Sequence, residues 1–354
     1  MPYPTKKLGD VLEKNGVIPA KIKRDEYQVN GKYPVVDQGE NLIAGYIDDE
    51  RKLYRGDLPV VIFGDHTRIL KYVDFPFAFG ADGIKILRPQ ANLLPKFFYY
   101  VLVFNPIQNQ GYKRHFSLLT HKKIPLPPLA TQKQIVERLD KIAEAQKLND
   151  DLIQKTDELF QSLLHKELNP DGPADAKAMA GKKDWEENKF INCIEKNPLK
   201  IKGIPREEYQ SVGKFPIIDQ SDKFIVGYTD NEDKVYKISS PVIIFGDHTR
   251  IFKYVDFNFA IGADGTQIIV PNAKFLPKFF YFLMLNLKIN NLGYSRHFKL
   301  LKTKKLTIPP LKTQKQIVAK LSAVQDYKKQ LLGQKAKLKE LFDSALAKSM
   351  SKDA

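Results

Sequence analysis

Apolar residues along the chain form short continuous runs in some places and widely spaced series in others. The runs PVVIF (59–63) and SPVIIF (240–245) predict buried strands. FAFGADGIKIL (77–87) predicts a strand, a Gly-Asp-Gly turn and a second strand, and LLPKFFYYVLVF (93–104) predicts a short helix packed on that sheet. Proline-rich phrases, PLPPL (125–129) and IPPL (308–311), then end regular structure.

Two segments after these prolines carry apolar residues three and four positions apart, which predicts long amphipathic helices. They begin near Thr131 and Thr313, which we expect to act as N-caps, and the first ends where LNPDG (168–172) interrupts the pattern. About 36 helical residues span roughly 54 Å. Because each apolar seam is narrow, each helix needs a partner, and the obvious partner is the other helix.

The chain is a tandem repeat with a constant offset of 182 positions. FGDHTRILKYVDF begins at Phe63 and FGDHTRIFKYVDF at Phe245, and GADG, LPKFFY, RHF and TQKQIV recur in the same register. More than half of the paired positions between Arg24 and Val136 and their counterparts are identical, with no insertion. This predicts two copies of one large unit.

The predicted fold class is α+β, with two tandem β-rich domains that are each followed by a long helix. The domains cover 1–128 and 184–310, and the helices cover 129–169 and 311–350. The Pro-, Gly- and Ala-rich segment 170–183 between the two units is typical of a flexible linker.

Charge indicates the class of partner. Lys and Arg number 57 against 41 acidic residues, which gives a net charge of +16 and favours a polyanion, most often nucleic acid. The single cysteine, Cys193, excludes an intramolecular disulfide and a multi-cysteine metal site. Because the N-terminal residues lack an apolar h-region and no run is long enough to span a membrane, we expect a soluble, cytoplasmic protein.

The repeated GDHTR phrase has the residue types of an active site. A His beside an Asp is typical of a general base, and a Thr of a nucleophile. However, the histidines show no H-x-x-x-H spacing, and the chain carries no phosphate-binding loop, dinucleotide fingerprint or methyltransferase-type signature. The pattern therefore disfavours catalysis, although a nuclease with one GDHT site per half remains an alternative. Gly64 and Asp65 are expected to shape the turn after the preceding strand.

A DNA-binding surface is the favoured function of the same loops. A loop with Thr-Arg-x-x-Lys suits phosphates and base edges, the GYxRHF loops form a second such surface, and the amides of Gln38 and Gln220 suit adenine. A solvated loop, or a turn role for the two glutamines, stays open. The predicted DNA-contacting residues are Gln38, His66, Thr67, Arg68, Lys71, Lys85, Tyr112, Lys113, Arg114 and His115, with Gln220, His248, Thr249, Arg250, Lys253, Gln267, Tyr294, Arg296, His297 and Lys299 in the second half.

The positions near these motifs that differ between the copies matter for specificity, and three of them carry a change of charge or polarity. Lys85 corresponds to Gln267, Lys113 to Ser295, and Ser117 to Lys299. Most of the strongest candidate readers are the same in both copies.

The whole chain resembles the specificity subunits of type I restriction–modification systems. The most specific marker is PLPPLATQKQIVERLD (125–140), repeated as TIPPLKTQKQIVAKL (307–321), and GDHTRI, GADG and GYxRHF also look like family motifs. The chain is somewhat short for the family, and its halves are unusually alike.

The resemblance implies a non-catalytic DNA reader that binds no cofactor itself. Its two domains would each read half of a bipartite site, and its helices would pack as an antiparallel coiled coil and set the spacing. Two methyltransferase subunits using S-adenosylmethionine, and restriction subunits using ATP and Mg²⁺, would dock on it. A system without restriction subunits is a narrower variant of this interpretation.

Antiparallel helices carried by tandem repeats give pseudo-twofold symmetry, which matches duplex DNA. A span near 54 Å corresponds to roughly 16 base pairs at ~3.4 Å each, enough for two half-sites and a spacer. Because the repeated motifs are shared, we expect a near-palindromic target. An assembly protein that binds RNA or a membrane surface through its charge alone remains a further alternative.

Overall fold

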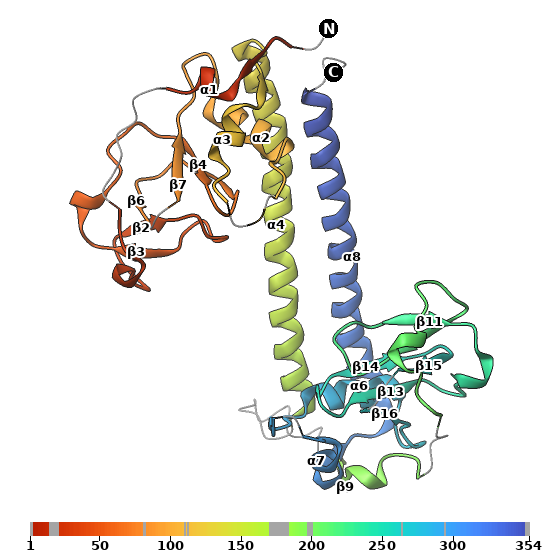
Figure 1. Cartoon of the computed structure of the whole chain (residues 1–354). Helices are drawn as coiled ribbons and strands as arrows, with labels where there is room; N and C mark the ends of the chain where they lie inside the picture. Colours follow the sequence, from red (N-terminus) through yellow and green to blue (C-terminus); the bar gives the residue numbers. More distant parts are fainter. Residues whose placement is uncertain are drawn as a thin grey trace. The chain divides into compact units, whose positions relative to one another are not determined.

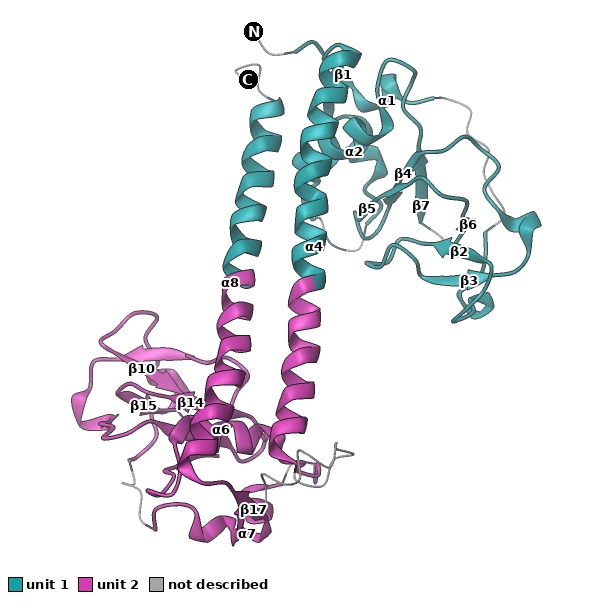
Figure 2. Ribbon diagram, turned by 180° about the vertical axis from the view of Figure 1, so that it is seen from behind, with its two compact units in different colours: residues 1–151, 332–354 teal, residues 152–331 magenta. Residues whose placement is uncertain are grey.

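A computed structural model describes residues 3–13, 21–80, 83–109, 111, 113–169, 184–196, 201–262, 265–293 and 295–350. The chain divides into two compact units, shown in teal and magenta in Figure 2: unit 1 comprises residues 1–151 and 332–354, and unit 2 comprises 152–331. The predicted linker, residues 170–183, lies outside the described residues.

Unit 1 is built from short strands and helices in the order that the apolar pattern predicted (Figure 1). The short helices α2 and α3 follow the strands, and β8 leads into the long helix. The elements are β1 (Thr5–Lys7), α1 (Leu8–Val11), η1 (Arg24–Glu26), β2 (Tyr33–Val36), β3 (Gly45–Ile47), η2 (Glu50–Lys52), β4 (Val60–Gly64), β5 (Leu70–Val73), β6 (Ala78–Phe79), β7 (Ile84–Leu87), α2 (Pro95–Phe104), α3 (Phe116–Thr120) and β8 (Lys123–Pro125).

Strand β4 is the centre of unit 1. It pairs antiparallel with β5 and β7, and every one of its residues is buried. Val61 and Phe63 face a core that includes helix α2, whereas Val60 and Ile62 face a second core with residues of β2 and β6. A strand covered on both faces explains why PVVIF is apolar without alternation. Strand β2 pairs antiparallel with β3 and parallel with β6, and β1 pairs with β8.

Unit 2 repeats this architecture at the same offset. Strand β13 again pairs with two antiparallel neighbours and is buried throughout. Its elements are β9 (Glu186–Lys189), η3 (Phe190–Asn192), η4 (Arg206–Glu208), β10 (Phe215–Ile218), β11 (Gly227–Thr229), η5 (Glu232–Lys234), β12 (Val235–Tyr236), β13 (Val242–Gly246), β14 (Phe252–Val255), β15 (Phe259–Ile261), β16 (Thr266–Ile269), α6 (Pro277–Asn286), α7 (Phe298–Thr303) and β17 (Lys305–Ile308).

The two long helices are α4 (Leu129–Leu168) and α8 (Leu311–Met350), and they pack together within each unit. In unit 1, Gln146 donates to the carbonyl oxygen of Leu338 (3.2 Å), and Lys335 pairs with Asp150 (2.8 Å). Residue numbers rise along one helix as they fall along the other, so the pair is antiparallel. In unit 2, Lys320 pairs with Glu167 and Lys328 with Asp157 in the same antiparallel sense.

The expectation that Thr131 and Thr313 cap these helices is wrong. The helices begin at Leu129 and Leu311, two residues earlier, immediately after the paired prolines. The carbonyl oxygen of Pro128 already accepts the N–H of Gln132 (3.0 Å), which places the start of the helix before the threonine. Within the described part of the chain, no helix is both long and apolar enough to cross a membrane.

Candidate nucleic-acid interface

Three repeated motifs meet at Asp65, which follows strand β4 and is only 3% exposed. Its N–H donates to the carbonyl oxygen of Gly83 (2.6 Å), in the GADG turn. Its own carbonyl oxygen accepts the N–H of His115 (2.9 Å), and its carboxylate accepts the N–H of Phe116 (2.7 Å) at the first turn of α3. Asp65 therefore joins the GDHTR, GADG and GYKRHF segments into one cluster.

Gln38 and His66 pack over Gly83 in this cluster. Gly83 has φ = +88°, and a Cβ atom there would lie 2.8 Å from Cδ2 of His66 and 2.9 Å from Nε2 of Gln38. Only glycine fits both the backbone conformation and the space. The Thr67 hydroxyl donates to the carbonyl oxygen of Gln38 (2.7 Å), which fixes the GDHTR loop on the segment after β2. Both the amide and the imidazole are half-buried at the edge of the unit.

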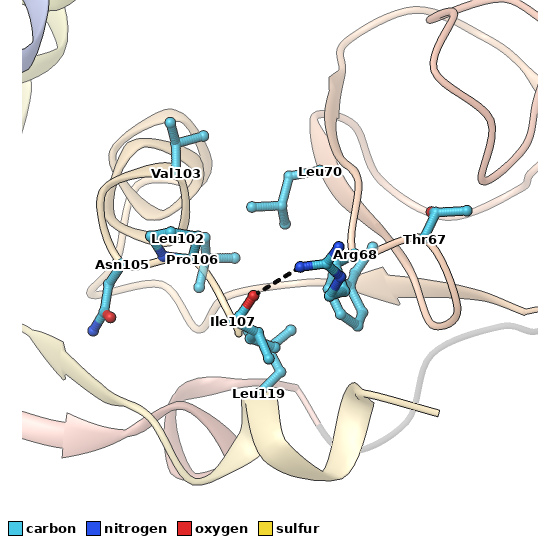
Figure 3. A pocket seen from close by; sticks show the side chains of 10 residues that line it. Thr67, Arg68, Leu70, Leu102, Val103, Asn105, Pro106, Ile107 and Leu119 are labelled. Carbon is cyan, nitrogen blue, oxygen red and sulfur yellow. Dashed lines mark hydrogen bonds between the residues drawn. The ribbon is translucent and has the colours of Figure 1, made fainter. Parts of the chain in front are cut away.

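Arg68 points into a cavity instead of outward (Figure 3). Its φ of +63° is unusual for a non-glycine residue, and its guanidinium donates to the carbonyl oxygen of Ile107 (3.2 Å). The cavity has a volume of about 340 Å³, and Leu70, Leu102 and the loop after α2 line it. The Nε atom of Arg68 is buried, with no hydrogen-bond partner among the described residues. Arg250 repeats the φ (+64°) and donates to Ile289 (3.3 Å).

Lys71 and His115, both predicted to contact DNA, lie inside unit 1. Lys71 is 5% exposed and its ammonium donates to the carbonyl oxygens of Asp37 (2.7 Å) and Asn41. Burial lowers the pKa of Lys71, and the nearby Asp37 carboxylate partly opposes that shift. His115 is fully buried, and its Nδ1 lies 3.0 Å from the carbonyl oxygen of Asp65. These two side chains brace the loops that carry the other candidates.

His297 of unit 2, the counterpart of His115, shows how such a buried histidine forms its hydrogen bonds. Nδ1 of His297 lies 2.8 Å from the carbonyl oxygen of Asp247, which only accepts, so Nδ1 carries the proton. Nε2 of the same ring accepts the N–H of Leu292 (3.0 Å). The ring is therefore neutral, with both nitrogens bonded, and it serves the fold. Lys253 is likewise buried and donates to the carbonyl oxygens of Asp219 (2.8 Å) and Lys223.

The remaining candidates reach the surface around the cluster. In unit 1, Lys113 and Arg114 are exposed, and Lys85 is half-buried with its ammonium 5.4 Å from the ring centre of Phe116. In unit 2, the side chains at the surface are Thr249, Arg296 and Lys299, with Gln220, His248 and Gln267 half-buried. Tyr112 and Tyr294 lie outside the described residues.

Unit 2 builds the same cluster with the same bonds. The carboxylate of Asp247 accepts the N–H of Phe298 (2.7 Å), and its N–H donates to Gly265 (2.7 Å). The hydroxyl of Thr249 donates to the carbonyl oxygen of Gln220 (2.6 Å).

Sequence reasoning missed Gln132, which joins the long helix to the β-rich part of unit 1. Its side chain is fully buried, accepts the N–H of Leu94 (2.8 Å) and donates to the carbonyl oxygens of Asn92 (3.0 Å) and Pro127 (2.9 Å). Gln314 makes the three corresponding bonds in unit 2. The repetition of TQKQIV was the available signal, because it kept a polar residue unchanged in both copies.

The family model described as the type I restriction modification DNA specificity domain matches residues 2–156 and again residues 182–341. The chain belongs to this family. Its two-unit architecture therefore corresponds to two specificity domains, and family membership gives it a role in DNA recognition.

Relatives and solved structures agree with this membership. The chain is 31% identical over 147 residues to the EcoR124I/EcoR124II specificity subunit of Escherichia coli, a match that covers 38% of the chain and 36% of that subunit. It is 25% identical over 412 aligned positions to the putative MjaX specificity subunit of Methanocaldococcus jannaschii, which covers 99% of the chain and 92% of that protein.

The fold matches the crystal structure of a type I system S subunit from M. genitalium with a TM-score of 0.69, at 16% identity, over 99% of this chain and 96% of that one. A chain from a structure of type I system assembly and conformational transition matches with a TM-score of 0.59, at 15% identity, over 100% and 98%. Both comparisons support a specificity-subunit fold, with two β-rich domains and paired long helices.

Proposed function

We propose that each unit reads one half of a bipartite DNA site through the cluster organised by Asp65 or Asp247. The observation that carries this proposal is that the two clusters are built from the same motifs with the same hydrogen bonds. A stable fold does not need the same polar cluster in both units. Two units that read similar half-sites do need the same polar side chains in the same arrangement.

Within each cluster, the exposed cations and the half-buried groups suit different parts of DNA. Arg114 and Arg296 are exposed and suit phosphates or the edge of guanine. The amide oxygens of Gln38 and Gln220 accept main-chain N–H groups of the GDHTR loops, at 3.4 and 3.1 Å, which orients both amides. An amide suits the two hydrogen bonds that adenine offers. The net charge of +16 supplies the attraction to the duplex that does not depend on sequence.

The target is proposed to be a near-palindrome with a spacer. The shared residues favour similar half-sites, and the differences at Lys85/Gln267, Lys113/Ser295 and Ser117/Lys299 favour departures from exact symmetry. A helix of 40 residues, such as α4 or α8, is about 60 Å long, the length of about 18 base pairs. That length suits two half-sites with a spacer.

The chain itself is proposed to be non-catalytic and to bind no cofactor. In this proposal, two methyltransferase subunits that use S-adenosylmethionine dock on it, and restriction subunits that use ATP and Mg²⁺ join them. In support, the carboxylates of Asp65 and Asp247, the acidic groups of the two GDHT phrases, are already engaged by main-chain N–H groups. We expect the purified chain to leave plasmid DNA intact with Mg²⁺, and nicking by the purified chain would favour the nuclease alternative.

Mapping N6-methyladenine in the host genome with and without this gene tests the proposal. We expect deletion to remove one bipartite motif, and Arg114→Ala to change or abolish methylation at that motif. Arg88→Ala, at an arginine of unit 1 that pairs with Glu13 (3.2 Å) and Asp57 (2.8 Å), serves as a control for general destabilisation. An unchanged methylome after deletion would overturn the proposal, and two unrelated half-sites would overturn its near-palindromic form.

A further inference from the structure

The two-stranded ribbon of β1 and β8 in unit 1 carries unneutralised positive charge. Lys7 of β1 lies directly opposite Lys123 of β8 in the antiparallel register. Both side chains are exposed, as is Lys6, and none of the three forms an ion pair with a described carboxylate. Like charges at directly opposite positions destabilise a strand pair unless something neutralises them.

In unit 2, a carboxylate offsets part of the corresponding like charge. Its ribbon of β9 and β17 places Lys189 opposite Lys305, but Glu187 lies diagonally across and pairs with Lys305 (2.7 Å). Glu186 in the same strand pairs with Lys274 (3.2 Å). One lysine of the like-charged pair, Lys305, is therefore neutralised within unit 2.

The corresponding carboxylates are absent from unit 1 by substitution. At the offset of 182, Thr5 stands where unit 2 has Glu187, and Pro4 stands where it has Glu186. The ribbon of unit 1, with Lys122, holds four lysines and no carboxylate, whereas the ribbon of unit 2, with Lys304, holds three lysines and two glutamates. The strand register is preserved, so only the charge differs.

We infer that the lysine ribbon of unit 1 binds the phosphate backbone of duplex DNA outside the bases that are read. Lys123 follows α3, a helix about 7.5 Å long whose first turn is bound by Asp65. The ribbon is thus adjacent to the proposed reading cluster, and its ammonium groups suit phosphates but no particular base. This inference rests on the proposed function and adds a contact that unit 2 lacks, so the chain would hold DNA more strongly on one side.

The chain supplies its own matched variants. Thr5→Glu places in unit 1 the carboxylate that unit 2 tolerates at the same position, and Glu187→Thr makes the reverse exchange. Each variant is compared with the unchanged protein in its native assembly, purified from the host, and its melting temperature confirms that it is folded. Lys123→Gln removes one charge without adding another.

The measurement is the affinity for duplex DNA across a range of salt concentrations. The slope of log K against log salt is negative, and each lost phosphate contact makes it shallower by about 0.9. The ratio of the affinity at 50 mM salt to the affinity at 200 mM salt then falls by about three-fold. We expect this change for Thr5→Glu and Lys123→Gln with the preferred sequence unchanged, and an equal or steeper slope for Glu187→Thr.

An unchanged slope in both Thr5→Glu and Lys123→Gln would overturn the inference. That result would fit the simpler role of exposed strand lysines, which is to discourage pairing with other strands. A shift in preferred sequence would also overturn it, because phosphate contacts do not distinguish bases. If the unchanged protein binds no duplex DNA at any salt concentration, the proposed function fails first, and the inference fails with it.

Discussion

Replacing Gln314 by Met tests whether one buried side chain joins the long helix α8 to the β-rich part of unit 2. Gln314 is fully buried, accepts the N–H of Leu276 (2.9 Å) and donates to the carbonyl oxygens of Lys274 (2.9 Å) and Pro309 (3.0 Å). Methionine has a similar volume but makes none of these bonds. Three lost bonds at about 0.5–1.5 kcal/mol each predict a loss of about 1.5–4.5 kcal/mol in the free energy of unfolding.

Unfolding in urea, followed by tryptophan fluorescence, measures this loss. The only tryptophan, Trp185, lies in unit 2 and packs against the core that contains Ile317 and Leu321 of α8. With a urea dependence of about 2 kcal/mol per molar, the midpoint should fall by about 1–2 M.

Lys315→Met is the control, because Lys315 is the exposed neighbour of Gln314 on the same helix. Its midpoint should stay close to that of the unchanged protein. Equal midpoints for the two variants would refute the reasoning, because the three hydrogen bonds would then contribute nothing measurable.

The other predictions concern unit 1. Gly83→Ala should destabilise the protein by more than 1 kcal/mol beyond Gly111→Ala, because both glycines have positive φ but a Cβ atom meets neighbours within 3 Å only at Gly83; equal melting temperatures would contradict this. Lys71→Met should lower stability by about 1–3 kcal/mol by leaving two carbonyl oxygens without their donor, and a thermal melt unchanged from wild type would disprove it. The Tyr100 hydroxyl donates to Asp140, so Tyr100→Phe and Asp140→Ser should each lower the free energy of unfolding. In a double-mutant cycle, the loss in the double variant should be smaller than the sum of the two single losses by about 1 kcal/mol. Additive losses would show that the two side chains are not coupled.

At the positions of Tyr100 and Asp140, the two copies differ at both partners of one hydrogen bond. Unit 2 has Phe282 where unit 1 has Tyr100, and Ser322 where unit 1 has Asp140. The donor and the acceptor were replaced together. In both units the lysine one turn earlier lies over a tyrosine ring, with Lys96 4.2 Å from the ring centre of Tyr72 and Lys278 4.3 Å from that of Tyr254.

Much of the fold was predictable, because apolar runs and spacing depend on local sequence. PVVIF and LLPKFFYYVLVF correspond to β4 and α2, and the two long periodic segments correspond to α4 and α8. The α+β class with paired long helices is confirmed. The prediction that Thr131 and Thr313 cap the long helices was wrong because two prolines allow a start directly after them, before the threonine that resembles a cap.

The interior of the candidate site was less predictable, because its bonds join residues far apart in sequence. Lys71 bonds to main-chain oxygens 30 and 34 positions away, and His115 to one 50 positions away. A charged or polar residue in a surface motif gives no local sign that it will be buried. The exposed positions of Lys113 and Arg114 agree with a contact surface, and their contact with DNA stays a prediction.

The buried side-chain donors of both units bond to main-chain atoms, and this affects which substitutions the protein can accept during evolution. Lys71, Gln132 and their counterparts bond to main-chain carbonyl oxygens, which every residue type provides. Asn41 and Asn92 of unit 1 are replaced by Lys223 and Lys274 in unit 2, yet the same bonds are kept. Substitutions at the acceptor positions therefore keep these hydrogen bonds, whereas substitutions of the donors remove them. A scan of all substitutions should find that the donor positions tolerate few residue types and the acceptor positions many. The loop surfaces can then change their DNA target without loss of folding.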